Sequence, residues 1–184
     1  MIRTRLETEV EMPIRYDNKR VTSLFQFKEA VKLIYAVLHN QISDDTEALA
    51  THWLQNPSLF SAHLTKSLQK NCLISLNVIA DSKPNRFAQQ IADNTDWVQL
   101  SLPINWSNIP YPPPKTWAFT FVDLFAGIGG FHIAMQENGG KCIFASEWNS
   151  YAKQTYEANF GLTPFGDITK LDARLIPDHD VLCA

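Results

Sequence analysis

Residues 117–137 read WAFTFVDLFAGIGGFHIAMQE and combine a strand pattern, a glycine loop and a helix pattern. The aromatic and β-branched run over 118–125 is typical of a strand buried in a parallel sheet. A glycine loop over 126–130 follows at once, and the helical pattern of 131–137 stops at Gly139 and Gly140. This order predicts the first βα unit of a parallel sheet. Its loop lets a ligand approach the backbone closely, and its helix N-terminus offers N–H groups to a carboxylate or phosphate.

A second strand and helix follow at the spacing of a nucleoside-binding unit. Residues 142–146 predict the strand, and residues 150–160 predict a helix that ends at Gly161. Glu147 follows the strand, 20 residues after Gly127, where an acid accepts hydrogen bonds from ribose hydroxyls in βαβ sites. Trp148 beside it can stack on a purine. The alternative for Glu147 is a solvated acid that favours the dipole of a helix start.

The remaining residues add an acid and a further strand. Asp167 lies in Gly166-Asp167-Ile168-Thr169, where its carboxylate can accept a hydrogen bond from an adenine amino group or can cap the following turn. Residues 178–184 predict another apolar strand. The spacing therefore predicts a nucleoside ligand, without distinguishing one nucleotide cofactor from another.

The composition divides the chain into two parts. All seven glycines lie between Gly127 and Gly166. Residues 1–116 carry 12 Lys and Arg against 11 Asp and Glu, a net +1, whereas residues 117–184 carry 4 against 8, a net −4. The proline-rich run Ile109–Lys115 is expected to be an extended, stiff linker, with a ligand for an aromatic groove as the alternative. We expect an N-terminal segment of unknown role over 1–108, a linker over 109–116 and a second domain over 117–184.

The N-terminal segment has the pattern of a small, mostly helical α+β structure. Apolar spacing and β-rich runs predict helices at 24–38, 48–54, 60–68 and 86–91, and strands at 2–10 and 72–80. The helices at 24–38 and 48–54, joined by a polar turn, can also be interpreted as a helix-turn-helix that reads DNA. Short amphipathic helices more often form a core, so the segment itself does not declare a function.

Several classes of protein are disfavoured by composition. The formal charge of −3 over 184 residues lacks the strongly basic balance typical of nucleic-acid binders. No apolar run approaches the ~20 residues that span a bilayer, and no signal-peptide core follows Met1–Arg5, so we expect a cytoplasmic protein without a membrane partner. Three distant cysteines and five scattered histidines predict neither a disulfide framework nor a metal site.

The glycine loop also carries a family resemblance. Residues Phe121–Phe131 closely resemble the first signature of the cytosine-5 DNA methyltransferases, and Ser146–Asn149, Gly166–Thr169 and Pro177–Ala184 look like the stretches that follow it in bacterial modification methylases. The likeness covers residues 119–184, a little over a third of the chain. It implies an α/β fold, the N-terminal portion of a Rossmann-like S-adenosylmethionine-dependent methyltransferase sheet from a restriction–modification system.

The same resemblance implies S-adenosylmethionine as cofactor and cytosine in duplex DNA as substrate. Phe125 would pack on the adenine, Trp148 and Ile168 would flank it, and Asp167 would accept a hydrogen bond from its amino group. Glu147 would hold the ribose, the loop would lie near the methionine part, and Asp123 would support the loop. The implied cofactor-binding residues are Asp123, Phe125, Gly127, Ile128, Gly129, Glu147, Trp148, Asp167 and Ile168.

No catalytic residue is expected within the chain. In the family that it resembles, a cysteine in a Pro-Cys dipeptide attacks C6 of a flipped cytosine, which makes C5 nucleophilic toward the methyl group. By the resemblance, this cysteine would lie four residues beyond Ala184. Cys183 instead resembles an earlier, non-catalytic cysteine, and a thiol inside a buried strand has a raised pKa and little reactivity.

Three hypotheses follow from these features. The chain is the N-terminal part of a DNA (cytosine-5-)-methyltransferase and is inactive alone. Alternatively, it is a subunit of a split enzyme, whose complementing polypeptide carries the Pro-Cys motif and the target-recognition domain. The third hypothesis is a non-enzymatic module that binds DNA or protein and keeps a remnant cofactor site.

Overall fold

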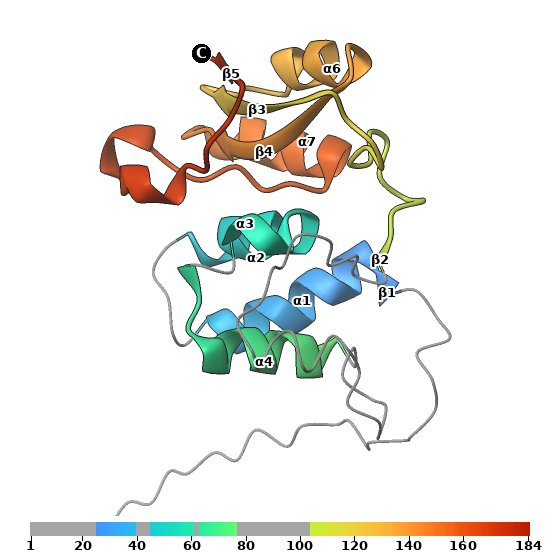
Figure 1. Cartoon of the computed structure of the whole chain (residues 1–184), viewed down its shortest axis with the longest axis vertical. Coiled ribbons are helices and arrows are strands. Elements are labelled where there is room, and N and C mark those ends of the chain that lie inside the picture. The colour runs from blue at the N-terminus through green and yellow to red at the C-terminus, as the bar shows by residue number, and fades with distance from the viewer. Residues whose placement is uncertain (1–24, 40–44, 61–62, 77–103) are drawn as a thin grey trace, which may run out of the picture.

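The computed structural model describes residues 25–39, 45–60, 63–76 and 104–184. In Figure 1 a sheet with its two flanking helices lies above the helices of the N-terminal half, and the segment after β2 joins the two parts at the right of the view. The elements in chain order are β1 (Phe25–Gln26), α1 (Phe27–Leu38), α2 (Thr46–Gln55), α3 (Pro57–Phe60), α4 (Lys66–Ser75), β2 (Ile104–Asn105), β3 (Phe119–Leu124), α6 (Gly130–Glu137), β4 (Gly140–Ser146), α7 (Ser150–Phe160), the 3₁₀ turns η2 (Ile168–Lys170) and η3 (Ala173–Leu175), and β5 (Val181–Cys183).

The sheet is parallel, with the strand order β4-β3-β5. A parallel bridge between Ser146 and Phe165 extends it on the far side of β4. The βα units predicted around residues 119–160 are therefore confirmed, and the fold class is that of a partial Rossmann-like α/β sheet. Its loops after β3 and β4 emerge at the same edge, because parallel strands share one direction.

Local signals in the sequence explain where α7 begins and ends. The Oδ1 atom of Asn149 accepts hydrogen bonds from the N–H groups of Tyr151 and Ala152, and so caps the start of the helix. Gly161, at φ 62°, ends the helix in the left-handed conformation that glycine adopts readily. Both ends of α7 are thus fixed by local signals, and the helix begins three residues after Glu147.

Two apolar cores cover the two faces of the sheet. Phe121 and Ala145 pack with Tyr156 and Phe160 on the face that α6 and α7 cover. This placement follows from the right-handed crossovers that join parallel strands. On the opposite face, Val122, Phe144 and Phe165 join one cluster with the buried side chains of α1, α2 and α4, including Trp53. The N-terminal helices therefore supply the second layer of the sheet (Figure 1).

Helix α2 is hydrogen-bonded to the edge of the sheet through its side chains. His52 Nε2 accepts from the N–H of Ala145 in β4 at 3.1 Å, and Thr51 Oγ1 accepts from the N–H of Thr163 at 3.0 Å. Gln55 Nε2 donates to the carbonyls of Phe160 and Gly161 at the end of α7, at 2.9 Å each. Asp45, just before α2, accepts from the N–H of Gly166 at 3.0 Å. These bonds satisfy backbone groups that an uncovered edge would leave unpaired.

The geometry around His52 fixes its protonation. Its Nδ1 atom faces the carbonyl of Ala48 at 2.8 Å and must donate, whereas Nε2 faces an N–H group and must accept. A neutral imidazole with its hydrogen on Nδ1 is the form that makes both bonds. Complete burial lowers the pKa of His52 to about 3, in agreement with this form.

Two predictions for the N-terminal segment need correction. The predicted strand at 72–80 is wrong over its described part, because Cys72–Ser75 belong to helix α4. Thr65 Oγ1 accepts from the N–H of Leu68 and starts the helix, and Cys72, Leu73 and Leu76 then bury at helical spacing. The predicted helix at 60–68 is divided between α3, which ends at Phe60, and α4, which begins at Lys66. Helices α1 and α2 confirm the predictions at 24–38 and 48–54 within a few residues.

The structure does not support the helix-turn-helix interpretation. Every residue of α2 except Glu47 is buried, so this helix offers no face to a DNA groove. The predicted strand at 2–10 and helix at 86–91 lie outside the described residues. The boundary placed at 109–116 stays a prediction, although the core of the described residues includes side chains on both sides of it. None of the described helices is long and apolar enough to cross a membrane.

Candidate functional site

The glycine loop after β3 needs its glycines for conformation and space. Gly127 and Gly129 have φ values of 55° and 99°. A Cβ atom built on Gly129 would lie 2.0 Å from Cε2 of Phe160, so α7 packs directly against the loop. On Gly127 it would meet only the Phe125 carbonyl oxygen at 4.0 Å, and on Gly130 it would meet nothing within 4 Å. The loop is therefore tightly packed on its inner side and open on its outer side.

Phe125 has an uncommon backbone conformation for a residue with a side chain. Its φ is 52°, in the left-handed region where a side chain costs about 1–2 kcal/mol. The strain turns the chain sharply from the strand into the loop and leaves the phenyl ring 67% exposed. Strained, exposed residues of this kind are concentrated at ligand sites.

Glu147 connects the second strand to the glycine loop. Its Oε2 atom accepts from the N–H of Gly127 at 2.8 Å, and its Oε1 atom accepts from the N–H of Asn149 at 2.8 Å. The side chain is buried. Each oxygen accepts one bond here and can accept another, so hydroxyl groups of a ligand can still bind. Glu147 lies beside the start of α7, as the alternative expects, but it is buried rather than solvated and also contacts the glycine loop.

Trp148, Asp167 and Ile168 flank this edge of the sheet. Trp148 is 80% exposed, and Ile168 packs against the core formed with the N-terminal helices. Asp167 caps η2: its Oδ1 atom accepts from the backbone N–H of Thr169 at 3.0 Å and from the Thr169 hydroxyl at 2.7 Å. These hydrogen bonds, followed by the nearby Lys170, lower the pKa of Asp167. The capping alternative is thus realised, while Oδ2 still faces outward toward Lys170.

Five large apolar side chains are exposed in the segments that follow β3 and β4, and we call them the apolar rim: Phe125, Ile128, Phe131, Trp148 and Tyr151. Aromatic faces of this kind suit a purine, which stacks on them. The rim lies in the segments that also carry the open outer side of the glycines and Glu147. The nine residues predicted for the site all lie at this edge or directly beneath it.

Asp123 lies beneath the loop and is fully buried. Its Oδ2 atom is 3.1 Å from the Tyr156 hydroxyl, which is 2.7 Å from His132 Nδ1. Sequence reasoning missed His132 and Tyr156 as site residues, since one was considered a scattered histidine and the other an apolar helix position. The signal that could have found them is the pair of polar side chains on the inner faces of helices that flank the loop.

All three cysteines of the chain are buried. Burial raises the pKa of the Cys183 thiol. Burial also raises the pKa of Cys72 to about 12. These thiols are protonated at neutral pH, and none has the environment of a reactive cysteine. Among the described residues, no group of three or more His, Cys, Asp or Glu side chains could hold a metal ion.

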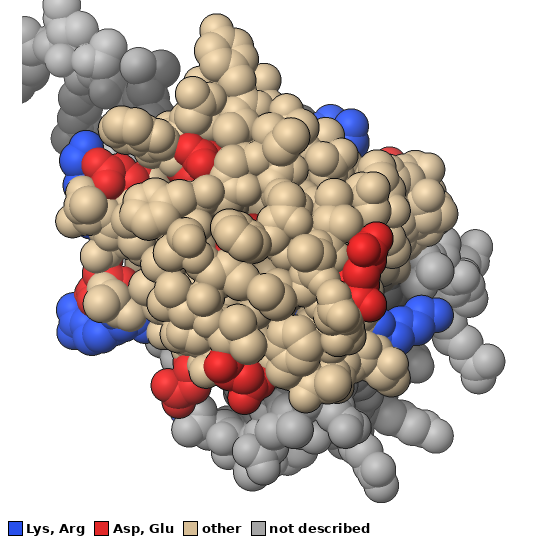
Figure 2. Space-filling view, turned by 90° about the horizontal axis from the view of Figure 1, so that it is seen from above, with Lys and Arg blue, Asp and Glu red and all other residues tan. Residues whose placement is uncertain are grey.

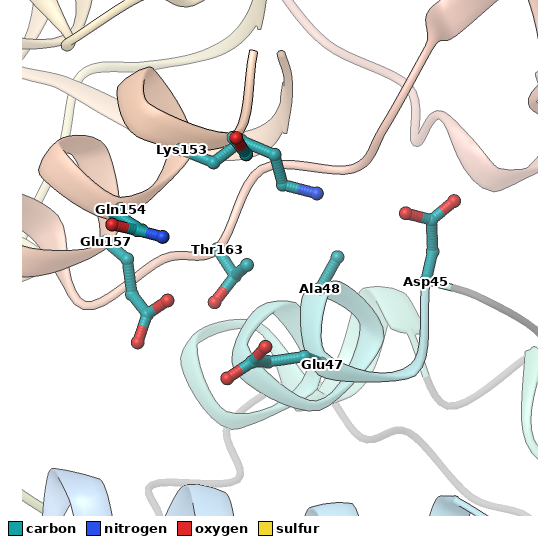
Figure 3. Close-up of a pocket in the computed structure, with 8 residues that line it drawn as sticks. Asp45, Glu47, Ala48, Lys153, Gln154, Glu157 and Thr163 are labelled. Carbon is teal, nitrogen blue, oxygen red and sulfur yellow. The ribbon is translucent and has the colours of Figure 1, made fainter. Parts of the chain in front are cut away.

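A pocket of about 210 Å³ lies away from the glycine loop, between the start of α2 and the outer side of α7. Figure 3 shows Glu47 and Glu157 pointing into it from the two helices, with Lys153 above them. Burial and the nearby Glu47 raise the pKa of Glu157. This pocket has none of the predicted site residues in its lining.

The surface above α6 does not favour nucleic acid. Figure 2 shows this face as mostly uncharged, with Lys and Arg scattered at its margin and Asp and Glu between them. The surface lacks the clustered positive charge that phosphate contacts require.

Comparison with known proteins identifies the C-terminal part of the chain. Residues 119–184 match the family model of the C-5 cytosine-specific DNA methylases. These residues make up a little over a third of the chain. We refer to these residues as the methylase segment.

Individual relatives match over the same stretch. Type II methyltransferase M.HpaII of Haemophilus parainfluenzae is 65% identical over 68 residues, which are 36% of this chain and 19% of the relative. M.MspI of Moraxella sp is 59% identical over 66 residues, 36% of this chain and 16% of the relative. M.HhaI of Haemophilus parahaemolyticus is 53% identical over 64 residues, which are 35% of this chain and 20% of the relative. The match thus spans only a fifth or less of the length of these relatives, and it confirms the resemblance of the methylase segment.

Proposed function

We propose that the methylase segment binds S-adenosylmethionine as the N-terminal part of a cytoplasmic DNA (cytosine-5-)-methyltransferase of a restriction–modification system. The observation that carries the proposal is the pair of hydrogen bonds by which Glu147 joins the glycine loop to the end of β4. Those bonds place an acid with free acceptor capacity beside an open loop and exposed aromatic rings. The family match of residues 119–184 supports the choice of cofactor.

Each predicted residue has a task in this proposal. Phe125, Trp148 and Ile168 bind the adenine, Asp167 accepts from its amino group, and Glu147 accepts from the ribose hydroxyls. Gly127, Ile128 and Gly129 bind the methionine part, and Asp123 supports them. The cofactor, when bound, supplies an electrophilic methyl group.

The proposal for cofactor binding is tested by isothermal titration of the 184-residue chain with S-adenosylmethionine. We expect Glu147→Gln to weaken binding by about tenfold or more, since a carboxylate hydrogen bond is worth about 1.5–3 kcal/mol. The matched control is Glu137→Gln, an exposed acid at the end of α6 that makes no contact with the loop. No binding by the unmodified chain, or equal binding by both variants, contradicts the proposal.

The chain alone is proposed to be inactive in methyl transfer, because its cysteines are buried and protonated. The catalytic Pro-Cys motif and the target-recognition residues are then supplied by sequence beyond residue 184 or by a complementing polypeptide, and duplex DNA is the shared substrate. Transfer of labelled methyl groups to duplex DNA is the measurement. Silence of the chain is expected, and activity on addition of the complementing polypeptide would support a split enzyme. Activity of the chain alone contradicts the assignment of the nucleophile.

A further inference from the structure

A series of hydrogen bonds runs from the buried Asp123 beneath the glycine loop to an exposed bond at the proline-rich segment. Asp123 Oδ2 lies 3.1 Å from the Tyr156 hydroxyl, and that hydroxyl lies 2.7 Å from His132 Nδ1. His132 Nε2 lies 3.1 Å from Oε1 of Gln136, whose Nε2 donates to the carbonyl of Pro112 at 3.0 Å. Five residues from four parts of the chain, namely the proline-rich segment, β3, α6 and α7, are thus connected.

The series has a direction that is set at Pro112. A carbonyl can only accept, so the Gln136 amide nitrogen faces Pro112 and its Oε1 atom faces His132. Oε1 also only accepts, so His132 Nε2 must carry a hydrogen. In a neutral imidazole, Nδ1 then accepts, and the Tyr156 hydroxyl must donate to it.

The direction of these hydrogen bonds decides whether Asp123 is protonated. An ionised Asp123 would accept from the Tyr156 hydroxyl across the 3.1 Å between their oxygens. With the Tyr156 hydrogen directed at His132, that contact is a hydrogen bond only if the Asp123 carboxyl carries a hydrogen and donates it to the Tyr156 oxygen. The other arrangement that satisfies every bond is a carboxylate at Asp123 with a doubly protonated His132, an ion pair separated by the tyrosine.

Burial favours the neutral arrangement over the ion pair. Asp123 is fully buried, and its Oδ1 atom has no hydrogen-bond partner among the described residues, which is costly for a carboxylate. Burial raises the pKa of Asp123 to about 7 and lowers the pKa of His132 to about 4. His132 also stacks on Phe160, with ring centroids 3.9 Å apart, in a site without water access for a cation.

The groups that face Asp123 from the neighbouring elements act on its pKa in both directions. Glu147, at the end of β4, adds a negative charge that raises the pKa of Asp123, and the Tyr156 hydrogen bond opposes it. Cys142 in β4 and Cys183 in β5 are neutral thiols whose pKa values are themselves raised. His132 in α6 is the remaining titratable group of the series.

We propose that Asp123 is a neutral carboxylic acid that donates to Tyr156, and that Tyr156 and His132 are positioning residues that hold this acid beneath the glycine loop. This inference rests on the proposed function, because it concerns the same site. It leaves Glu147 as the charged carboxylate that contacts a ligand, whereas Asp123 is uncharged. When Asp123 loses its proton, Tyr156 turns its hydrogen to the carboxylate, the proton of His132 moves from Nε2 to Nδ1, and the Gln136 amide turns from the exposed bond to Pro112 so that its nitrogen donates to Nε2.

The tautomer of His132 is the direct test, and it needs no cofactor. Long-range ¹⁵N–¹H spectra of the 184-residue chain at pH 6 are expected to show the Nε2–H form for His132 and the Nδ1–H form for His52, which serves as an internal comparison. On raising the pH through about 7, His132 should shift toward the Nδ1–H form while His52 does not change. A doubly protonated or Nδ1–H His132 at pH 6 would overturn the proposal.

The variant Asp123→Asn tests whether titration of Asp123, and not of another group, changes the tautomer of His132. An asparagine amide donates to Tyr156 as the neutral acid does but does not titrate. We expect the Nε2–H form of His132 to persist in this variant from pH 6 to pH 9, whereas the exposed control Asp178→Asn retains the shift. A shift that survives in Asp123→Asn contradicts the proposal. Because these spectra are recorded without S-adenosylmethionine, failure to bind that cofactor leaves their result intact.

Discussion

A methyl group at position 129 has no room. The φ of Gly129 is 99°, and its Cβ would lie 2.0 Å from the Phe160 ring, which is itself packed in the core. We expect Gly129→Ala to lower the free energy of unfolding by about 2–4 kcal/mol, from overpacking and from the left-handed backbone. Gly130→Ala is the control, since its Cβ meets no atom within 4 Å. Equal urea midpoints for the two variants would be evidence against this packing.

The strain at Phe125 is also measurable. Its φ of 52° penalises any side chain, whereas glycine is free of the penalty. We expect Phe125→Gly to be more stable than Phe125→Ala by about 1 kcal/mol, although both lose the same ring. Chemical denaturation of the two variants measures the difference. At Phe131, which is exposed at the start of α6, the order should reverse, because glycine destabilises a helix by about 1 kcal/mol relative to alanine.

At the scale of the element, the attachment of α2 to β4 depends on a neutral His52. The folded pKa of about 3 lies below the ordinary value of 6.5, so His52 contributes stability above pH 6.5 that is lost as the pH falls toward 3. We expect the stability advantage of the unmodified chain over His52→Gln to shrink across this window. The contribution of Asp123 to stability changes in the opposite sense, because its pKa is raised from 3.8 to about 7 and its contribution is lost as the pH rises through this range. Subtracting the profile of His52→Gln from that of the unmodified chain removes this shared effect.

The control for this pH dependence is His179→Gln, which removes an exposed histidine near β5. Its denaturation midpoint should follow that of the unmodified chain at every pH. If the His52→Gln profile runs parallel to the unmodified one between pH 6.5 and 4, protonation of His52 is not coupled to unfolding.

Elements with strong local signals could be predicted from sequence, and those fixed by tertiary contacts could not. The glycine loop, Glu147 and Gly161 carry their own turn and cap chemistry, and the strands and helices around them are where the pattern predicts them. The stretch Cys72–Ser75 is β-rich in composition but forms a helix, because Thr65 caps it and its apolar residues pack on the other helices. Likewise, the positioning role of Tyr156 depends on a partner 33 residues away, which no local pattern contains.

At the scale of the whole molecule, the N-terminal helices and the methylase segment share one apolar core. We therefore expect them to unfold together. In native-state hydrogen exchange, the amides of Ala30 in α1 and Ala145 in β4 should lose protection at the same denaturant concentration. The variant Gln55→Leu, which removes the hydrogen bonds to Phe160 and Gly161, should lower the protection of these two amides equally. Loss of protection at Ala145 alone would mean that the two parts unfold independently.

Helix α2 is synthesised long before the groups that it satisfies: Thr51 precedes its partner Thr163 by 112 residues, and Asp45 precedes Gly166 by 121. During translation, the residues of α2 therefore leave the ribosome before the sheet residues that they contact in the folded chain. Helix α2 is therefore already synthesised when β4 emerges, and it is available to cover a strand edge that could otherwise pair with another chain.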